Sequence, residues 1–140
     1  MKLEKISYEG LNSRQKEIFN FQKVAGRLAE YGFNCIKLAD DWQGADFLAY
    51  HKDGSSTLKV QLKSRATIDK KYQGKDLFLA FPIRKGKDED WYLVNHDEFV
   101  AVVQEHTNWM STDSWIEGGG YSSDSPSEKL VKELESCRLT

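Results

Sequence analysis

Asp46, Gln61 and Lys63 are three polar side chains whose chemical types suit the hydrolysis of a phosphodiester. A carboxylate and an amide oxygen are hard ligands of the kind that Mg²⁺ prefers in proteins. A nearby ammonium group can orient or deprotonate a water molecule and can neutralise the charge that develops on the phosphorus centre. This chemistry requires the three groups to meet at one point of the fold.

A predicted β-hairpin brings these groups together. Residues 45–50 form its first strand, an Asp-Gly turn signal follows at 53–54, and residues 57–63 alternate between apolar and polar side chains. Because successive side chains of a strand point to opposite faces, Gln61 and Lys63 share one face. Antiparallel pairing in the matching register then places the carboxylate at the start of the first strand beside them. Alternatively, the carboxylate caps a turn and the other two groups face solvent.

The arrangement resembles the PD-(D/E)xK nuclease superfamily, which places Asp and then Glu-x-Lys on the two strands of a hairpin behind an N-terminal helix. The matching residues are Asp46 and Gln61-Leu62-Lys63. The string Val60-Gln61-Leu62-Lys63-Ser64-Arg65 is similar to the corresponding strand of archaeal Holliday-junction resolvases, with Gln in place of Glu. The resemblance covers about residues 12–95. It implies a restriction-endonuclease-like α/β core, in which a mixed central β-sheet of about five strands is flanked by an N-terminal helix and C-terminal helices.

The resemblance also implies a function. We expect a metal-dependent DNA endonuclease that hydrolyses phosphodiester bonds with Mg²⁺, or with Mn²⁺ in its place. Asp46 would be the main metal ligand, Gln61 a neutral oxygen ligand, and the peptide carbonyl of Leu62 a further ligand, while Lys63 would act on the water and the developing charge. Gln-x-Lys occurs in active branches of the superfamily. It nevertheless weakens Mg²⁺ binding, because affinity for a hard cation rises with ligand charge.

Two other functions are compatible with the same residues. The fold could be kept with an inactive site, which would leave a module that binds nucleic acid or serves as a scaffold, and neutral Gln at two acidic positions favours this alternative. The resemblance could also be coincidental, and the chain would then be an α/β interaction domain whose acidic C-terminal half docks a basic partner.

An amphipathic helix is predicted from Asn12 to Tyr31, with Asn12 and Gln15 as a capping box and Gly32 at its end. Its apolar residues recur at spacings of three and four: Ile18, Phe21, Val24, Ala25 and Leu28. Members of the superfamily often add a Glu from this helix. Gln22 takes that place here as a helper residue, and Glu17 is the alternative helix carboxylate.

Charge is distributed unevenly along the chain. Residues 51–87 carry 10 basic and 3 acidic side chains, whereas residues 88–140 carry 3 and 12. Four cations follow the hairpin and are expected to contact nucleic-acid phosphates without reading sequence: Arg65, Lys70, Lys71 and Lys75. A solvated loop is the alternative for this segment.

The length of 140 residues indicates a single domain, with a core at about 12–106 and a C-terminal loop and helix at 107–140. Residues 64–76 are polar and are expected to form one short helix. The remaining predicted elements are strands at 33–38, 77–81 and 91–94, a helix at 97–105, an irregular loop at 107–125 and a helix at 128–137. Pro82 is expected to end the strand that precedes it.

Composition excludes several classes of protein. No apolar run approaches the roughly 18 residues of a membrane span, and the charged start lacks the apolar region of a signal peptide, so a cytoplasmic location without membrane contact is expected. No pair of His and Cys has the spacing of a zinc site. Relatives of this build often act as dimers, so we expect a homodimer or larger homo-oligomer, with Trp109 or Trp115 at the interface.

Overall fold

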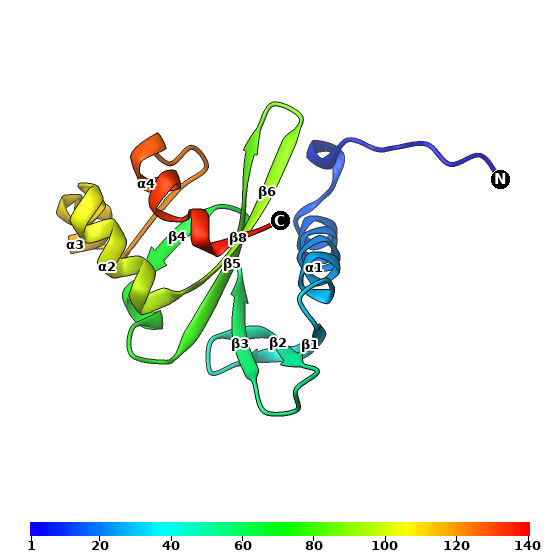
Figure 1. Ribbon diagram of the computed structural model, residues 1–140. Coiled ribbons are helices and arrows are strands. Elements are labelled where there is room, and N and C mark those ends of the chain that lie inside the picture. Colours follow the sequence, from blue (N-terminus) through cyan, green and yellow to red (C-terminus); the bar gives the residue numbers. More distant parts are fainter.

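A computed structural model describes residues 1–140, apart from the side chain of Trp42, and shows a central sheet with helices on both faces (Figure 1). The helical elements are the 3₁₀ turns η1 (Tyr8–Gly10), η2 (Lys70–Tyr72), η3 (Trp109–Ser111) and η4 (Glu135–Cys137), and the α-helices α1 (Ser13–Ala29), α2 (His96–His106), α3 (Asp113–Ile116) and α4 (Glu128–Glu133). The strands are β1 (Phe33–Trp42), β2 (Ala45–His51), β3 (Thr57–Leu62), β4 (Ala66–Asp69), β5 (Leu77–Lys85), β6 (Asp88–Asn95), β7 (Gly120–Ser123) and β8 (Arg138–Leu139).

The main sheet has six strands in the order β1-β2-β3-β5-β6-β8. Only β3 and β5 run parallel, and the other neighbours are antiparallel, so the sheet is mixed. A separate two-stranded sheet joins β4 to β7. The predicted α/β class is confirmed, and the count of about five strands becomes six because the end of the chain adds β8.

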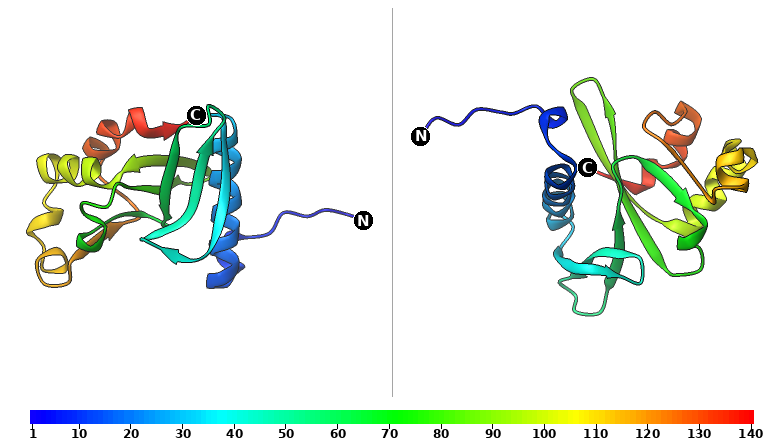
Figure 2. Two further views of the ribbon diagram at one scale, coloured as in Figure 1. Left: turned by 90° about the horizontal axis from the view of Figure 1, so that it is seen from below. Right: turned by 180° about the vertical axis from the view of Figure 1, so that it is seen from behind.

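Helix α1 covers one face of this sheet alone, and the later helices lie on the other side (Figure 2). Its predicted cap is confirmed: the Asn12 side chain accepts a hydrogen bond from the Gln15 amide, and the Gln15 side chain accepts one from the Asn12 amide. Val24 and Leu28 are buried against the sheet, but Ile18 is 39% exposed. The buried face of the helix is therefore rotated relative to the predicted one.

The opposite face of the sheet carries the larger core. Trp109 and Trp115 are only 6% and 5% exposed, and the Trp109 ring packs against Phe99 and Tyr121. The prediction that either tryptophan lies at an interface between copies is therefore wrong. Both side chains are already enclosed by the chain itself.

Two polar segments form more regular structure than predicted. Residues 64–76 contain β4 and η2 instead of one short helix, and residues 107–125 contain η3, α3 and β7 instead of an irregular loop. Pairing between β4 and β7 explains both differences, because this contact between distant segments leaves no local signal. Strand β5 also continues through Pro82, which lies beyond the last β3 partner at Ala80, where a missing N–H is tolerated.

A polar network fastens the β5–β6 hairpin to α1. Glu89 accepts hydrogen bonds from Arg84 Nε at 2.8 Å and from Trp91 Nε1 at 3.0 Å, and Lys23 Nζ lies 3.8 Å from its carboxylate. Burial acts to raise the pKa of Glu89, but these hydrogen bonds and cations outweigh burial and hold it below its usual value.

Glu89→Gln is expected to lower the free energy of unfolding by about 1.5 to 3 kcal/mol near neutral pH, because it removes hydrogen bonds to a charged acceptor. A depressed carboxylate pKa stabilises the fold above the unfolded pKa of about 4.3, and this contribution is lost as pH falls through the folded pKa. The difference in Tm between wild type and variant should therefore shrink in acid. Thermal melts across pH test this, and a difference independent of pH would contradict it.

Candidate functional site

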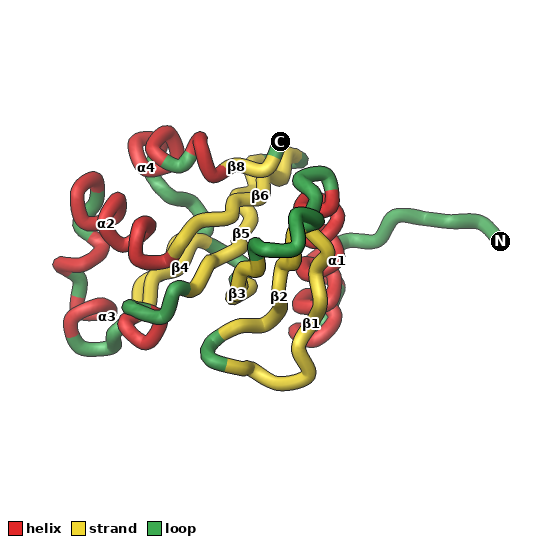
Figure 3. The backbone as a smooth tube through the Cα atoms, turned by 60° about the horizontal axis from the view of Figure 1, so that its bottom comes forward, coloured by secondary structure: helices red, strands yellow, loops and turns green.

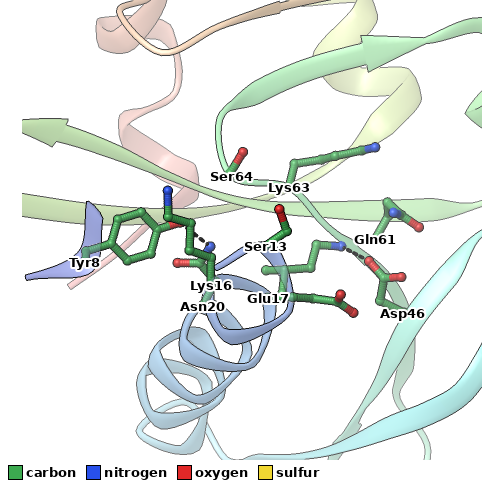
Figure 4. Close-up of a pocket in the computed structure, with 10 residues that line it drawn as sticks. Tyr8, Ser13, Lys16, Glu17, Asn20, Asp46, Gln61, Lys63 and Ser64 are labelled. Atoms are coloured by element: carbon green, nitrogen blue, oxygen red, sulfur yellow. Dashed lines mark hydrogen bonds between the residues drawn. The ribbon is translucent and has the colours of Figure 1, made fainter. Parts of the chain in front are cut away.

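A cavity of about 470 Å³ opens between the N-terminal turns of α1 and the adjoining ends of β2 and β3 (Figure 4). Its walls come from four separate stretches of the chain, and every lining side chain except that of Leu62 is polar. The lining residues are Tyr8, Ser13, Lys16, Glu17, Asn20, Asp46, Gln61, Leu62, Lys63 and Ser64. The predicted trio of carboxylate, amide and ammonium is thus gathered around one open space.

The register of the hairpin positions Asp46. Phe47 pairs with Val60, and continuing this antiparallel ladder by one residue sets Asp46 opposite Gln61. The Leu62 amide donates a hydrogen bond of 2.8 Å to Asp46 Oδ2 across the end of the ladder. This bond fixes the carboxylate at the cavity wall and leaves its other oxygen without a hydrogen-bond donor among the described residues.

The environment of Asp46 disfavours its charged form. Burial is the main reason that the pKa of Asp46 is raised, and the negative charges of Asp41 and Glu17 raise it further. The Leu62 hydrogen bond and the charge of Lys37 act in the opposite direction without cancelling the increase. A carboxylate held in this way gains from any cation that enters the cavity.

Gln61 is 8% exposed, and its Oε1 atom is shielded from solvent without a hydrogen-bond partner among the described residues. An unsatisfied buried acceptor costs about 1–3 kcal/mol relative to a satisfied one. Figure 4 shows the Gln61 amide beside the Asp46 carboxylate. Two neighbouring residues of the cavity lining thus each carry an oxygen that has no hydrogen-bond donor among the described residues.

Lys63 extends from the end of β3 toward the side of Gln61, away from Lys16 (Figure 4). Its Nζ lies 5.3 Å from the centroid of the Tyr72 ring, and it forms no ion pair or hydrogen bond with the described residues. An ammonium held over an aromatic ring is attracted to the ring face but keeps its three donors. Lys63 is therefore available to a water molecule or an anion.

Helix α1 contributes Glu17 to the cavity rather than Gln22. Gln22 is exposed and does not line the cavity, whereas the Glu17 carboxylate points toward Asp46 and its Oε1 lies 3.4 Å from Lys37 Nζ. Glu17 and the buried Val24 are seven residues apart and share one face of the helix. The Glu17 side chain therefore lies on the face of α1 that packs against the sheet. Of the two helix residues named from the sequence, Glu17 therefore lines the cavity and Gln22 does not.

The donor set fits a single Mg²⁺ ion with few protein ligands. The described residues contain no group of three Asp, Glu, His or Cys side chains arranged to hold a metal. The available donors are hard oxygens, the Asp46 carboxylate and the orphaned Gln61 Oε1, and Mg²⁺ commonly takes one or two protein carboxylates, keeps several waters and binds substrate phosphate.

The four basic residues expected to contact phosphates do not form one patch. Arg65 lines a second cavity, next to the first. Lys71 and Lys75 line a smaller hollow with Asp41 and Tyr72. Lys70 lines neither of these spaces, and its Nζ lies 5.3 Å from the centroid of the Trp115 ring.

Several lining residues were not predicted from the sequence, among them Tyr8, Lys16 and Asn20. Asn20 would have been expected at an apolar position because it lies one helical turn before Val24, and a buried Asn there is a signal that a polar partner faces it. Tyr8 has no comparable local signal, since it precedes the helix and reaches the site only through the fold.

No family model matches the chain, and no curated protein sequence matches it. None of the helices in the described part of the chain is long and apolar enough to cross a membrane. The functional assignment therefore depends on the residues of the cavity.

Asp46→Asn is expected to raise the free energy of unfolding near neutral pH, because Asn keeps an acceptor for the Leu62 amide and removes the unfavourable charge. A raised carboxylate pKa means that the folded state binds the proton more tightly, so the wild type loses stability as pH rises through the interval between the unfolded and folded pKa. The gain in Tm should vanish near pH 3, below the ordinary carboxylate pKa of about 4. Melts without added metal measure this, and a variant that is less stable than wild type at neutral pH would refute it.

Proposed function

We propose that this chain is a metal-dependent nuclease of the PD-(D/E)xK type with a restriction-endonuclease-like core, and that it hydrolyses phosphodiester bonds of DNA. One observation carries the proposal. The orphaned Gln61 Oε1 lies beside an Asp46 carboxylate of raised pKa, with the unpaired Lys63 ammonium on the same wall of an open cavity. A cation and a phosphate oxygen would satisfy the three groups together.

Asp46 and Gln61 would hold Mg²⁺, with the Leu62 carbonyl as a further ligand. The bound ion would supply Lewis-acid polarisation of the phosphate and stabilise negative charge in the transition state. Lys63 reaches the same space with three free N–H donors, so it would orient the attacking water and hydrogen-bond the phosphate oxygens as their charge grows. The hydrogen bond from the Leu62 amide keeps one carboxylate oxygen occupied and so directs the other toward the cavity.

A second candidate function is a nucleic-acid-binding module with a silent site. It is favoured by the shortage of carboxylates, because the described residues offer no group of three metal-ligating side chains. If the metal binds weakly, the lysine side chains that line the cavity, Lys16 and Lys63, would be the main source of affinity for nucleic acid.

Incubation of supercoiled plasmid and of a branched DNA with the purified protein tests the proposal. We expect nicking in Mg²⁺ and in Mn²⁺, and none in EDTA. Retarded migration of DNA in a salt-sensitive way without cleavage would reject the nuclease and support the binding module. The absence of both would reject both functions.

A further inference from the structure

A second cavity, of about 380 Å³, adjoins the candidate site. The two cavities share Tyr8, Lys16 and Ser64 as a common wall. The second cavity is completed by Glu9, Arg65, Pro82, Arg84 and Asp124. Its three cations come from α1, from the link between β3 and β4, and from β5, so the tertiary fold gathers them.

The hydrogen bonds behind this wall determine the direction of the Tyr8 hydroxyl. Arg84 can only donate, and its Nη2 donates to Asn20 Oδ1 at 3.0 Å. The Asn20 amide is therefore oriented so that its Nδ2 donates to the Tyr8 hydroxyl oxygen, at 2.9 Å. Asn20 is only 3% exposed, which holds this chain in place. Since the Tyr8 oxygen already accepts, its own proton remains to be donated to a ligand acceptor.

The cations around Tyr8 keep unused donors. The Arg65 guanidinium has five N–H groups, but its one hydrogen bond to a described residue is from Nη2 to the Ser122 carbonyl, and its Nε is buried without a partner. Lys16 Nζ lies 5.1 Å from the Tyr8 ring centroid, and its ion pair with the exposed Glu9 spans 3.5 Å. Arg84 is occupied by Glu89 and Asn20 and acts as support. Asp124 is the other carboxylate that lines the cavity.

We infer that Tyr8, Lys16 and Arg65 bind the backbone phosphate next to the one that is cleaved, so that the substrate is a polynucleotide strand running across both cavities. This inference rests on the proposed function, since the first cavity supplies the neighbouring phosphate position. A directed hydroxyl donor that lines one cavity together with two cations suits a phosphate oxygen, which only accepts. Contacts of this kind position a strand without reading its sequence. A mononucleotide fills one cavity only and should bind much more weakly.

Binding of a fluorescent oligothymidylate in EDTA, followed by anisotropy at several salt concentrations, tests the inference. Tyr8→Phe keeps the aromatic ring, which contacts Lys16 and Arg84, and removes the hydroxyl. We therefore expect about tenfold weaker binding of the oligonucleotide. Lys16→Ala should also reduce the slope of log affinity against log salt, by about 0.7 for the phosphate contact it loses. Thymidine monophosphate should not compete at concentrations where unlabelled oligothymidylate does. The matched controls are Tyr50→Phe, an exposed tyrosine on β2, and Lys129→Ala on α4.

Cleavage assays of the same proteins separate this inference from the proposed function. If the wild type cuts DNA while Tyr8→Phe and Lys16→Ala bind and cut normally, the second phosphate site is wrong and the nuclease stands. If the wild type binds without cutting and both variants weaken binding, the phosphate site stands and the nuclease is wrong. A wild type that does not bind the oligonucleotide overturns the inference.

Discussion

Asp46→Ala is expected to abolish metal-dependent cleavage, with a loss of at least about 10³-fold in rate. Asp46 is the one carboxylate of the described residues that combines a raised pKa, a position fixed by a hydrogen bond and a place in the cavity lining opposite Gln61. A metal ion contributes several kcal/mol of charge stabilisation to such a reaction, and each 1.36 kcal/mol is a factor of ten. Loss of the ligand should remove Mg²⁺ binding and cleavage together.

Lys63→Met provides the contrast, because it keeps the length of the side chain without the charge. We expect cleavage to fall by about 10²–10³-fold, as for the loss of one electrostatic donor, while Mg²⁺ binding is retained or strengthened. Calorimetric Mg²⁺ titration and plasmid nicking measure the two effects separately. Asp88→Ala, an exposed carboxylate of the β5–β6 hairpin, is the matched control and should cut like wild type. Full activity of Asp46→Ala would indicate a different active site or a contaminating nuclease.

The parts of this site that follow from the sequence are those set by neighbouring residues. Alternation along β3 and into the residue that follows it places Gln61 and Lys63 on one face, and the hairpin register then brings Asp46 opposite Gln61. The Asn12 cap and the left-handed Gly32, with φ +87°, are likewise local features, although the helix already ends at Ala29 instead of the predicted Tyr31. Each depends on a few consecutive side chains, and each agrees with the structure.

The parts that do not follow depend on how elements rotate and meet. A helical periodicity gives a stripe of apolar residues but leaves open which edge of it faces the site, and for this reason Gln22 was expected where Glu17 lies. Tyr8 enters the cavity through contacts with Asn20 and Arg84, and Arg84 lies on β5, far away in the sequence. Figure 3 shows β5 between β3 and β6 in the main sheet. Pairing of β4 with β7 is also non-local. Such contacts depend on the whole tertiary fold.

Gln61→Met is expected to make the protein more stable and less active. Met has a similar volume and removes the Oε1 atom that is buried without a partner, so the free energy of unfolding should rise by about 1 kcal/mol and Tm by about 3 °C. The same change removes a neutral metal ligand, so cleavage should require higher Mg²⁺ concentrations. Stability and activity would then change in opposite directions at one atom, which distinguishes a ligand from a packing residue. A Met variant that is less stable than wild type would indicate that Oε1 has a structural partner, such as a buried water.

Gln61→Glu should show the reverse behaviour. Without metal, a second carboxylate buried beside Asp46 is an uncompensated charge that destabilises the fold by roughly 3 kcal/mol, or raises its own pKa until it is neutral. With millimolar Mg²⁺, two carboxylates bind the cation more tightly than one, so Tm should increase more for this variant than for wild type. Melts in EDTA and in Mg²⁺ measure both effects, and Ca²⁺ in place of Mg²⁺ separates binding from cleavage. Equal metal-dependent increases in Tm for the Glu variant and wild type would show that Gln61 is not a ligand and that the orphaned oxygen serves another purpose.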